Sequence, residues 1–264
     1  MMWSLIKIVV AVAVGVPLLM WMFQEHMIFF PRRLDSRPAP RSNVEEVTIA
    51  VPDGVTLRGW FVRGTVVPAP LVIYFGGNAE EVSWMAEFGD NFAGWSMLLV
   101  NYRGYGESEG RPGERALLAD ALAIYDYARK RSDVNPERMA AMGRSLGSGV
   151  AVHLAAERAV RGVILVSPYD SLVEVGRRHY PFLPMSLMLR HRFDSLSRVP
   201  RIGAPLLCMV ASEDRIIPPS HSRALFEAWR GDKEWREIAN VDHNSIAGEP
   251  QYWRSIADFL KSVR

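Results

Sequence analysis

The sequence predicts an α/β fold, a mostly parallel β-sheet with helices on both faces. Several short apolar runs have the composition of strands buried on both faces, which is typical of parallel sheets. Helix-forming segments separate these runs, and this alternation of strand and helix indicates an α/β architecture. The chain has 264 residues, of which 49% are hydrophobic, which is enough for one domain with a large core.

Residues 1–30 are predicted to be an N-terminal membrane anchor. The stretch 5–23 is apolar apart from Lys7, and about 20 residues span the hydrocarbon core of a bilayer. A cleaved signal peptide is the alternative, although the small-residue pattern at 11–13 lies inside the apolar stretch rather than after it. We therefore expect a single-pass membrane protein, with the side of the membrane left open.

The folded domain is expected to occupy residues 44–264. Before it, residues 31–43 are rich in Pro, Arg and Ser, the composition of a linker. The domain opens with an antiparallel hairpin, in which residues 47–51 and 55–62 flank the turn residues Pro52-Asp53-Gly54.

The remaining elements follow from apolar runs and helical stripes. The helix at 114–131 is the clearest, because its apolar residues form one stripe, it begins at Glu114 and it ends on three basic residues, as the helix dipole favours. Strands are expected at 71–75, 97–100, 139–142, 163–166, 206–210 and 234–239, and further helices at 148–156 and 251–263.

An insertion at about 168–204 is predicted to be a small cap.

Residues 143–147 spell Gly-Arg-Ser-Leu-Gly, the pattern G-x-S-x-G. Because a predicted strand precedes them and a predicted helix follows, Ser145 would lie at the apex of a strand–turn–helix, the geometry of a nucleophile elbow. The flanking glycines suit a turn in which bulkier residues would collide with the adjoining strand and helix. A plain turn of small residues is the alternative, so the rest of the chain must decide.

Two further residues complete the set that a nucleophilic serine requires. Acyl transfer by serine needs a base, which takes the hydroxyl proton, and a carboxylate that orients the base. Asp214 follows the strand at 206–210, and His243 lies between the strand at 234–239 and the last helix. We therefore expect Ser145, Asp214 and His243 at one edge of the sheet as a catalytic triad. Glu213 and Asp242 are the alternative acids.

The glycine-rich loop Phe75-Gly76-Gly77-Asn78-Ala79 follows the first buried strand. Such a loop presents backbone N–H groups, so the backbone N–H groups of Asn78 and Leu146 are predicted to form an oxyanion hole. A plain strand-to-helix turn is the alternative.

Composition excludes several classes of function. A net charge of +2 gives no nucleic-acid-binding pattern. The single cysteine, Cys208, lies in an apolar run and cannot form an internal disulfide. Because no Cys/His cluster is present, neither a metal nor a cofactor is predicted.

The combined motifs resemble the membrane-anchored α/β hydrolases of the bud-emergence-protein-like group, which are related to the α/β-hydrolase-domain-containing proteins. The resemblance covers about residues 24–264 and implies the α/β-hydrolase fold, with hydrolysis of an ester, a thioester or an amide. The chain has Gly76 where the family usually has His, and Asn101 where it usually has Asp. The motifs that carry the resemblance are 75–79, 101–110, 143–147, 167–171, 213–214 and 243–244.

The cap is apolar at 180–185 and 187–189 and is flanked by arginines. It is predicted either to be a lid over an acyl pocket, leaning toward anionic lipid headgroups, or to be an ordinary helical excursion. Under the first interpretation, the residues expected to line the pocket are Gly77, Tyr169, Phe182 and Leu183.

The sequence thus predicts a membrane-anchored serine hydrolase that cleaves an acyl ester or thioester through an acyl-enzyme. Its partners would be a small acyl substrate, a lipid or an acylated protein, and the membrane, contacted through residues 5–23. A serine peptidase or amidase of the same fold, and a non-catalytic binding scaffold, are the alternatives. Because every catalytic candidate lies beyond Asn78 and the hairpin begins near Val47, a chain without residues 1–30 is expected to fold and remain active. The oligomeric state is open.

Overall fold

The computed structural model describes residues 2–263, without the side chains of residues 5, 6 and 8–14. Eight strands form one sheet in the order β1-β2-β4-β3-β5-β6-β7-β8. The bounds of the strands are β1 (Val44–Ala50), β2 (Thr56–Val62), β3 (Ala69–Phe75), β4 (Ser96–Val100), β5 (Val134–Arg144), β6 (Gly162–Val166), β7 (Leu206–Ala211) and β8 (Lys233–Ile238).

The sheet is parallel from β4 to β8 and antiparallel at its N-terminal end, where β1 pairs with β2 and β2 with β4. This arrangement confirms the predicted α/β-hydrolase fold. The predicted hairpin is β1 and β2, and each predicted parallel strand is present. Strand β5 begins at Val134, five residues before the apolar run at 139–142. Val134 pairs with Ala69 of β3, and regular pairing with β3 resumes at Met139.

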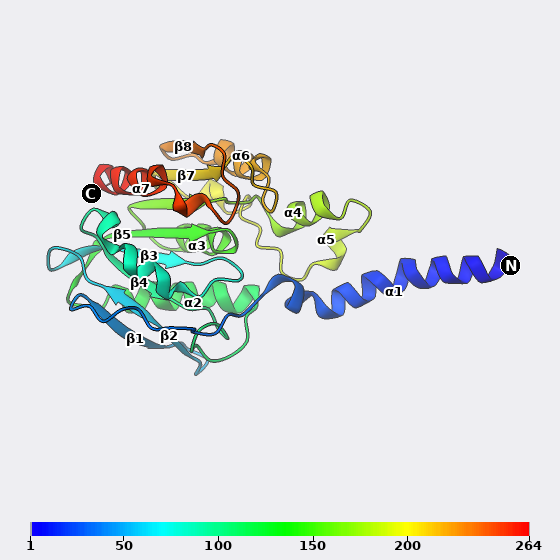
Figure 1. Cartoon of the computed structure of the whole chain (residues 1–264), viewed down its shortest axis with the longest axis horizontal. Helices are drawn as coiled ribbons and strands as arrows, with labels where there is room; N and C mark the ends of the chain where they lie inside the picture. The colour runs from blue at the N-terminus through cyan, green and yellow to red at the C-terminus, as the bar shows by residue number, and fades with distance from the viewer. Residues whose placement is uncertain (1, 264) are drawn as a thin grey trace.

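Helices cover both faces of the sheet (Figure 1). On one face pack α2 (Glu114–Ala128), α3 (Leu146–Glu157) and α6 (Pro219–Ala228). On the other face pack the 3₁₀ segment η1 (Val82–Phe92) and the last helix, α7 (Pro250–Ser262). Alternate residues of β3 contribute to the two cores, Leu71 and Ile73 to the first and Val72 and Tyr74 to the second. Such a strand must be apolar on both faces, as the sequence predicted.

The insertion after β6 forms two short helices, α4 (Leu172–His179) and α5 (Met185–Met188). Ser171 caps α4, since its side chain accepts from the backbone N–H of Glu174. One 3₁₀ turn, η2 (Val199–Arg201), lies between α5 and β7, and another, η3 (Ile246–Gly248), lies between β8 and α7. Figure 1 places α4 and α5 beside the base of α1 (Met2–Ile28), which projects away from the rest of the molecule.

Helix α1 contains the stretch 5–23 that the sequence predicts as a membrane span. Much of this stretch, the side chains at 5, 6 and 8–14, lies outside the described residues. Within the part of the chain that is described, no helix is long and apolar enough to cross a membrane. Residues 31–43 follow without a helix or a strand.

The last turn of α1 packs against the domain. The Gln24 side chain donates to the carbonyl of Met188 at 3.2 Å and accepts from the backbone N–H of Arg190 at 2.7 Å. Phe29 is 3% exposed and meets the rings of His191 and Phe193 edge to face. That a chain without residues 1–30 folds and remains active stays a prediction, and these contacts add the expectation that such a chain is less stable than the full-length protein.

Candidate active site

Ser145 lies at a strained turn between β5 and α3. Its φ of 51° and ψ of −120° fall outside the regions that residues with a side chain favour. Such a conformation costs about 1–3 kcal/mol and persists where the surrounding structure holds it. The backbone N–H of Ser145 donates to the carbonyl of Val166 on the neighbouring strand at 2.9 Å. The turn therefore has the geometry expected of a nucleophile elbow.

The two glycines of the motif are required by close backbone approach. A Cβ atom at Gly143 would lie 2.2 Å from the carbonyl oxygen of Gly147. A Cβ atom at Gly147 would lie 2.1 Å from the carbonyl oxygen of Phe75. Both contacts are with backbone, which cannot move aside, so larger residues would push the helix away from the sheet.

Ser145, His243 and Asp214 form a hydrogen-bonded chain. The Nε2 atom of His243 lies 2.9 Å from Oγ of Ser145, and its Nδ1 atom lies 2.7 Å from Oδ2 of Asp214. All three residues are buried, with 4–7% of their surface exposed. The structure therefore brings together the three residues that the sequence nominated, while Asp242 is exposed and bonds within its own turn.

Asp214 is held as a carboxylate by its loop. Its Oδ1 atom accepts from the backbone N–H groups of Ile216 at 3.0 Å and Ile217 at 2.8 Å. Burial raises the pKa of this carboxyl, but the hydrogen bonds from His243 and from the Ile217 backbone outweigh it, and the pKa of Asp214 is lowered overall. An ionised carboxylate can orient the imidazole of His243 and stabilise its charged form.

Both residues predicted to supply the oxyanion donors lie at the pocket that contains Ser145. Asn78 and Leu146 both line that pocket. Leu146 is the first residue of α3, so its backbone N–H has no acceptor within the helix. Among the described residues, the backbone N–H of Asn78 has no protein acceptor either. Two N–H groups beside a serine hydroxyl are what a developing oxyanion requires.

Four hydrogen bonds fix the glycine loop. The Tyr102 hydroxyl donates to the carbonyl of Gly76 at 2.9 Å, and the Tyr105 hydroxyl donates to the carbonyl of Asn78 at 2.5 Å. The N–H of Gly77 donates to Glu80 at 2.7 Å, and Phe30 donates its N–H to the same Asn78 carbonyl at 3.1 Å. The loop is thus held in place with glycine rather than histidine at position 76.

A buried ion pair links the loop to the elbow. Arg144 donates from Nη1 to Glu80 at 3.0 Å and from Nη2 to the carbonyl of His243 at 3.0 Å. Glu80 also accepts from the hydroxyl of Tyr74 and from the indole N–H of Trp84. Arg144 therefore joins the glycine loop, the elbow and the histidine loop, and nothing in the sequence pattern pointed to this role.

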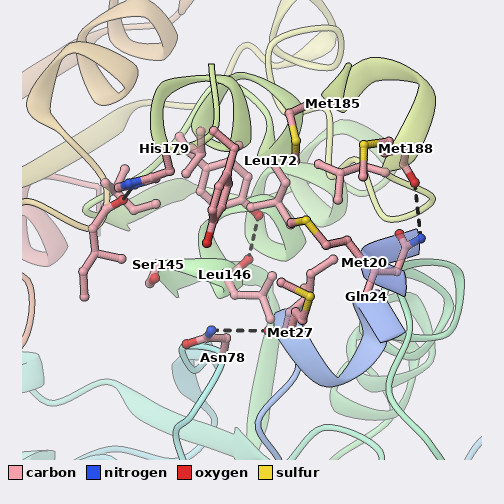
Figure 2. Close-up of a pocket in the computed structure, with 18 of the residues that line it drawn as sticks. Met20, Gln24, Met27, Asn78, Ser145, Leu146, Leu172, His179, Met185 and Met188 are labelled. Carbon is pink, nitrogen blue, oxygen red and sulfur yellow. Dashed lines mark hydrogen bonds between the residues drawn. The ribbon is translucent and has the colours of Figure 1, made fainter. Parts of the chain in front are cut away.

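A mainly apolar pocket of about 240 Å³ opens at Ser145. Figure 2 shows its walls, with Met20, Gln24 and Met27 of α1 on one side and Leu172, Met185 and Met188 of the cap on the other. The methionines give the walls flexible thioether side chains, which adapt to a ligand's shape. None of the described lining residues is Asp, Glu, Lys or Arg. The pocket therefore suits an uncharged hydrocarbon group attached to the carbonyl that Ser145 would attack.

The predicted pocket residues divide into two groups. Tyr169 lines the pocket and donates from its hydroxyl to the Leu146 carbonyl at 3.1 Å. Gly77 is not among the lining residues, and its N–H donates to Glu80. Phe182 and Leu183 are not in the wall, because they lie on the outer turn between α4 and α5, where Phe182 is 97% exposed.

The wall formed by α1 was missed by sequence reasoning. Met20, Trp21 and Met27 belong to a stretch whose apolar character is equally suited to lipid contact, so composition carried no signal. Gln24, a polar residue at the end of the apolar stretch, was the one sequence feature that could have indicated this wall. It is buried where α1 meets the cap and donates to the Met188 carbonyl.

The described part of the chain offers neither a metal site nor a reactive thiol. No group of three or more His, Cys, Asp or Glu side chains there could hold a metal ion. Cys208 is fully buried, and burial raises the pKa of its thiol, which makes it unreactive.

Comparison with known proteins decides the family. A family model described as "Serine aminopeptidase, S33" matches residues 67–190. The Mycobacterium tuberculosis protein Rv2307c is 37% identical over 247 residues, which cover 90% of this chain and 87% of that protein. The chain belongs to the α/β-hydrolase family.

Two further relationships are informative for this α/β hydrolase. The Saccharomyces cerevisiae membrane protein YNL320W is 29% identical over 235 residues, covering 86% of this chain and 81% of that protein. The Pyrococcus furiosus esterase Pf2001 is 20% identical and superposes with a TM-score of 0.69, covering 88% of this chain and 98% of the esterase. The second likeness shows a shared fold.

Proposed function

We propose that this protein is a serine hydrolase that cleaves acyl esters or thioesters. The observation that carries the proposal is the hydrogen-bonded chain from Asp214 through His243 to Ser145, which ends in an apolar pocket. Family membership supports a hydrolase, and the pocket supports an acyl group as the part of the substrate that it binds.

The first half of the reaction forms an acyl-enzyme. Oγ of Ser145 attacks the carbonyl carbon while Nε2 of His243 takes the hydroxyl proton. The resulting oxyanion accepts hydrogen bonds from the backbone N–H groups of Asn78 and Leu146. When the tetrahedral intermediate collapses, the bond from carbon to the leaving oxygen or sulfur breaks, and His243 returns its proton to that leaving atom.

The second half releases the acid. A water molecule gives a proton to His243 and attacks the acyl carbon, and the tetrahedral intermediate that results is held by the same two N–H groups. The bond to Oγ of Ser145 then breaks, and the serine regains its proton from His243. Throughout, Asp214 orients the imidazole and stabilises its positive charge.

Peptide hydrolysis is the rival activity, favoured by the description of the matching family model. An aminopeptidase must recognise a charged α-amino group, which a carboxylate would bind. Since the described pocket wall contains no Asp or Glu, acyl substrates are favoured over free amino termini.

We also propose that α1 anchors the protein in a membrane through residues 5–23. The apolar composition of that stretch and the similarity to a yeast membrane protein support the anchor. Carbonate-washed membranes should retain the full-length chain. Its recovery in the soluble fraction, shortened at the N-terminus, would instead establish a cleaved signal.

A substrate panel tests the proposed activity. Purified full-length protein is assayed against matched acyl esters, acyl thioesters and aminoacyl amides, with Ser145→Ala as the control for contaminating activity. We expect turnover of esters or thioesters that is lost in the variant. Turnover of the aminoacyl amides alone would reassign the protein as a peptidase.

A further inference from the structure

The cap and α1 together expose an unusual amount of apolar surface around the pocket. Phe182 is 97% exposed and Leu187 is 82% exposed, both on the outside of the cap. On α1, Leu18, Leu19 and Phe23 are each more than half exposed. Soluble monomers seldom expose many large apolar side chains in one region, and such a surface marks an interaction site.

The charges of the cap suit a particular partner. Between Glu174 and Asp194 the chain contains four arginines and no acidic residue, and two of these arginines are paired, Arg177 with Glu174 and Arg190 with Glu25. Arg178 is exposed, and among the described residues it has no ion-pair partner. Arg190 lies over the ring of Trp21, 5.0 Å from its centroid, so it sits where α1 meets the cap. Arginines around exposed aromatic and aliphatic side chains fit the headgroup region of an anionic bilayer.

The position of the pocket gives this surface a use. Its wall is shared between α1 and the cap, as Figure 2 shows, so the space leading to Ser145 lies between these two elements. Figure 1 shows that α4 and α5 lie on the side of the molecule from which α1 projects. A bilayer around α1 would therefore meet the cap as well.

We propose that the cap tip, formed by Phe182 and Leu187, inserts into the bilayer surface, so that the pocket receives its acyl chain directly from the membrane. The proposal rests on the proposed hydrolase function and names the substrate class as acyl chains embedded in a lipid bilayer. The outer turn that the sequence assigned to the pocket wall would then be a membrane contact. This contact would help the substrate reach the pocket and would not change Ser145, His243 or Asp214.

A fluorescent label at the cap tip tests the contact without relying on activity. The only cysteine, Cys208, is fully buried, so a cysteine introduced at Phe182→Cys can be labelled selectively with an environment-sensitive dye. The matched control is Val66→Cys, which is 50% exposed in the loop before β3, at the opposite edge of the sheet from Ser145. Both proteins are full length and reconstituted in vesicles of phosphatidylcholine and phosphatidylglycerol.

We expect the dye at position 182 to shift to the blue and to be quenched by lipids that carry a spin label on the acyl chain. The dye at position 66 should show neither effect. Equal, water-like emission from both positions would overturn the membrane contact.

Activity provides the second arm. In the same vesicles, Phe182→Ser/Leu187→Ser should lose about tenfold in turnover of a long-chain ester dissolved in the bilayer, because two apolar anchors are gone. Turnover of a water-soluble butyryl ester should match wild type, and Val66→Ser should behave as wild type in both assays. Unchanged turnover of the bilayer substrate would overturn the inference while leaving the hydrolase intact. Failure of wild type to cleave either ester would instead sink the proposed function.

Discussion

Arg144 and His243 are joined by a hydrogen bond of 3.0 Å, from Nη2 of the guanidinium to the backbone carbonyl oxygen of the histidine. The residue directly before the candidate nucleophile therefore holds the loop that carries the candidate base. The other arm of the same guanidinium binds Glu80, which in turn accepts from the N–H of Gly77. One buried ion pair thus fixes the relative positions of three loops that meet at the site.

Replacing Arg144 with Lys should lower kcat without a comparable change in KM. Lysine keeps the positive charge beside Glu80 but cannot donate to Glu80 and to the His243 carbonyl in the same planar geometry. A displacement of the base of about 1 Å can cost about 100-fold in rate, so we expect a fall of ten- to 100-fold in kcat. Steady-state kinetics on a short acyl ester gives both constants.

The matched control is Arg158→Lys, which alters a more exposed ion pair with Asp126 at 3.0 Å. That variant should keep wild-type kinetics, because exposed pairs contribute little. A wild-type kcat in Arg144→Lys would mean that Arg144 does not position the base. A loss of activity that is matched by a lower melting temperature would mean that Arg144 stabilises the fold instead.

Phe29 and Phe30 form a natural comparison for the end of α1. Phe29→Ala should destabilise the fold by about 3–5 kcal/mol, the usual cost of removing a buried aromatic ring. Phe30 is 46% exposed, so Phe30→Ala should change the free energy of unfolding by about 0.5 kcal/mol or less. Urea unfolding of the two full-length variants measures the difference. Equal effects would mean that residues 24–30 are not part of the folded domain.

Leu172 tests whether the apolar pocket binds the acyl chain. Its side chain lines the pocket, so Leu172→Trp should fill space that a long chain would occupy. Each methylene that the pocket buries contributes about 0.8 kcal/mol, so the loss in kcat/KM should grow with chain length. Water-soluble esters from acetyl to octanoyl provide the series.

The control for this substitution is Leu196→Trp, which enlarges a leucine that is 40% exposed and lies outside the pocket wall. It should leave the chain-length profile unchanged. A uniform loss across all chain lengths in Leu172→Trp would indicate damage to the triad, and the acyl chain would then have to be placed elsewhere.

The sheet and the candidate triad could be predicted because their signals are local. Strands buried on both faces are apolar throughout, as at 71–75, and a strained elbow requires small residues on both sides of Ser145. Asp214 and His243 followed from the order of the motif and from their positions after strands, since parallel strands end at one edge of the sheet.

The pocket could not be predicted in the same way. An apolar helix has the same composition whether it faces lipid, a protein core or a ligand, so α1 gave no sign that Met20 and Met27 line a cavity. The pairing of Arg144 with Glu80 joins residues 64 positions apart and depends on how two loops meet. The apolar residues Phe182 and Leu183 lie in a short irregular turn, where no periodicity indicates which side is buried.

We propose that Ser145 is a nucleophile activated by His243 and Asp214. Labelling of the full-length protein by a fluorophosphonate probe tests it most directly, because the probe reacts with an activated serine hydroxyl. We expect rapid labelling of wild type, none in Ser145→Ala, and labelling slowed by several orders of magnitude in His243→Ala, with Asp214→Asn severe but milder. A wild-type rate of labelling in Ser145→Ala, or no labelling of folded wild-type protein, would show that Ser145 is not an activated nucleophile.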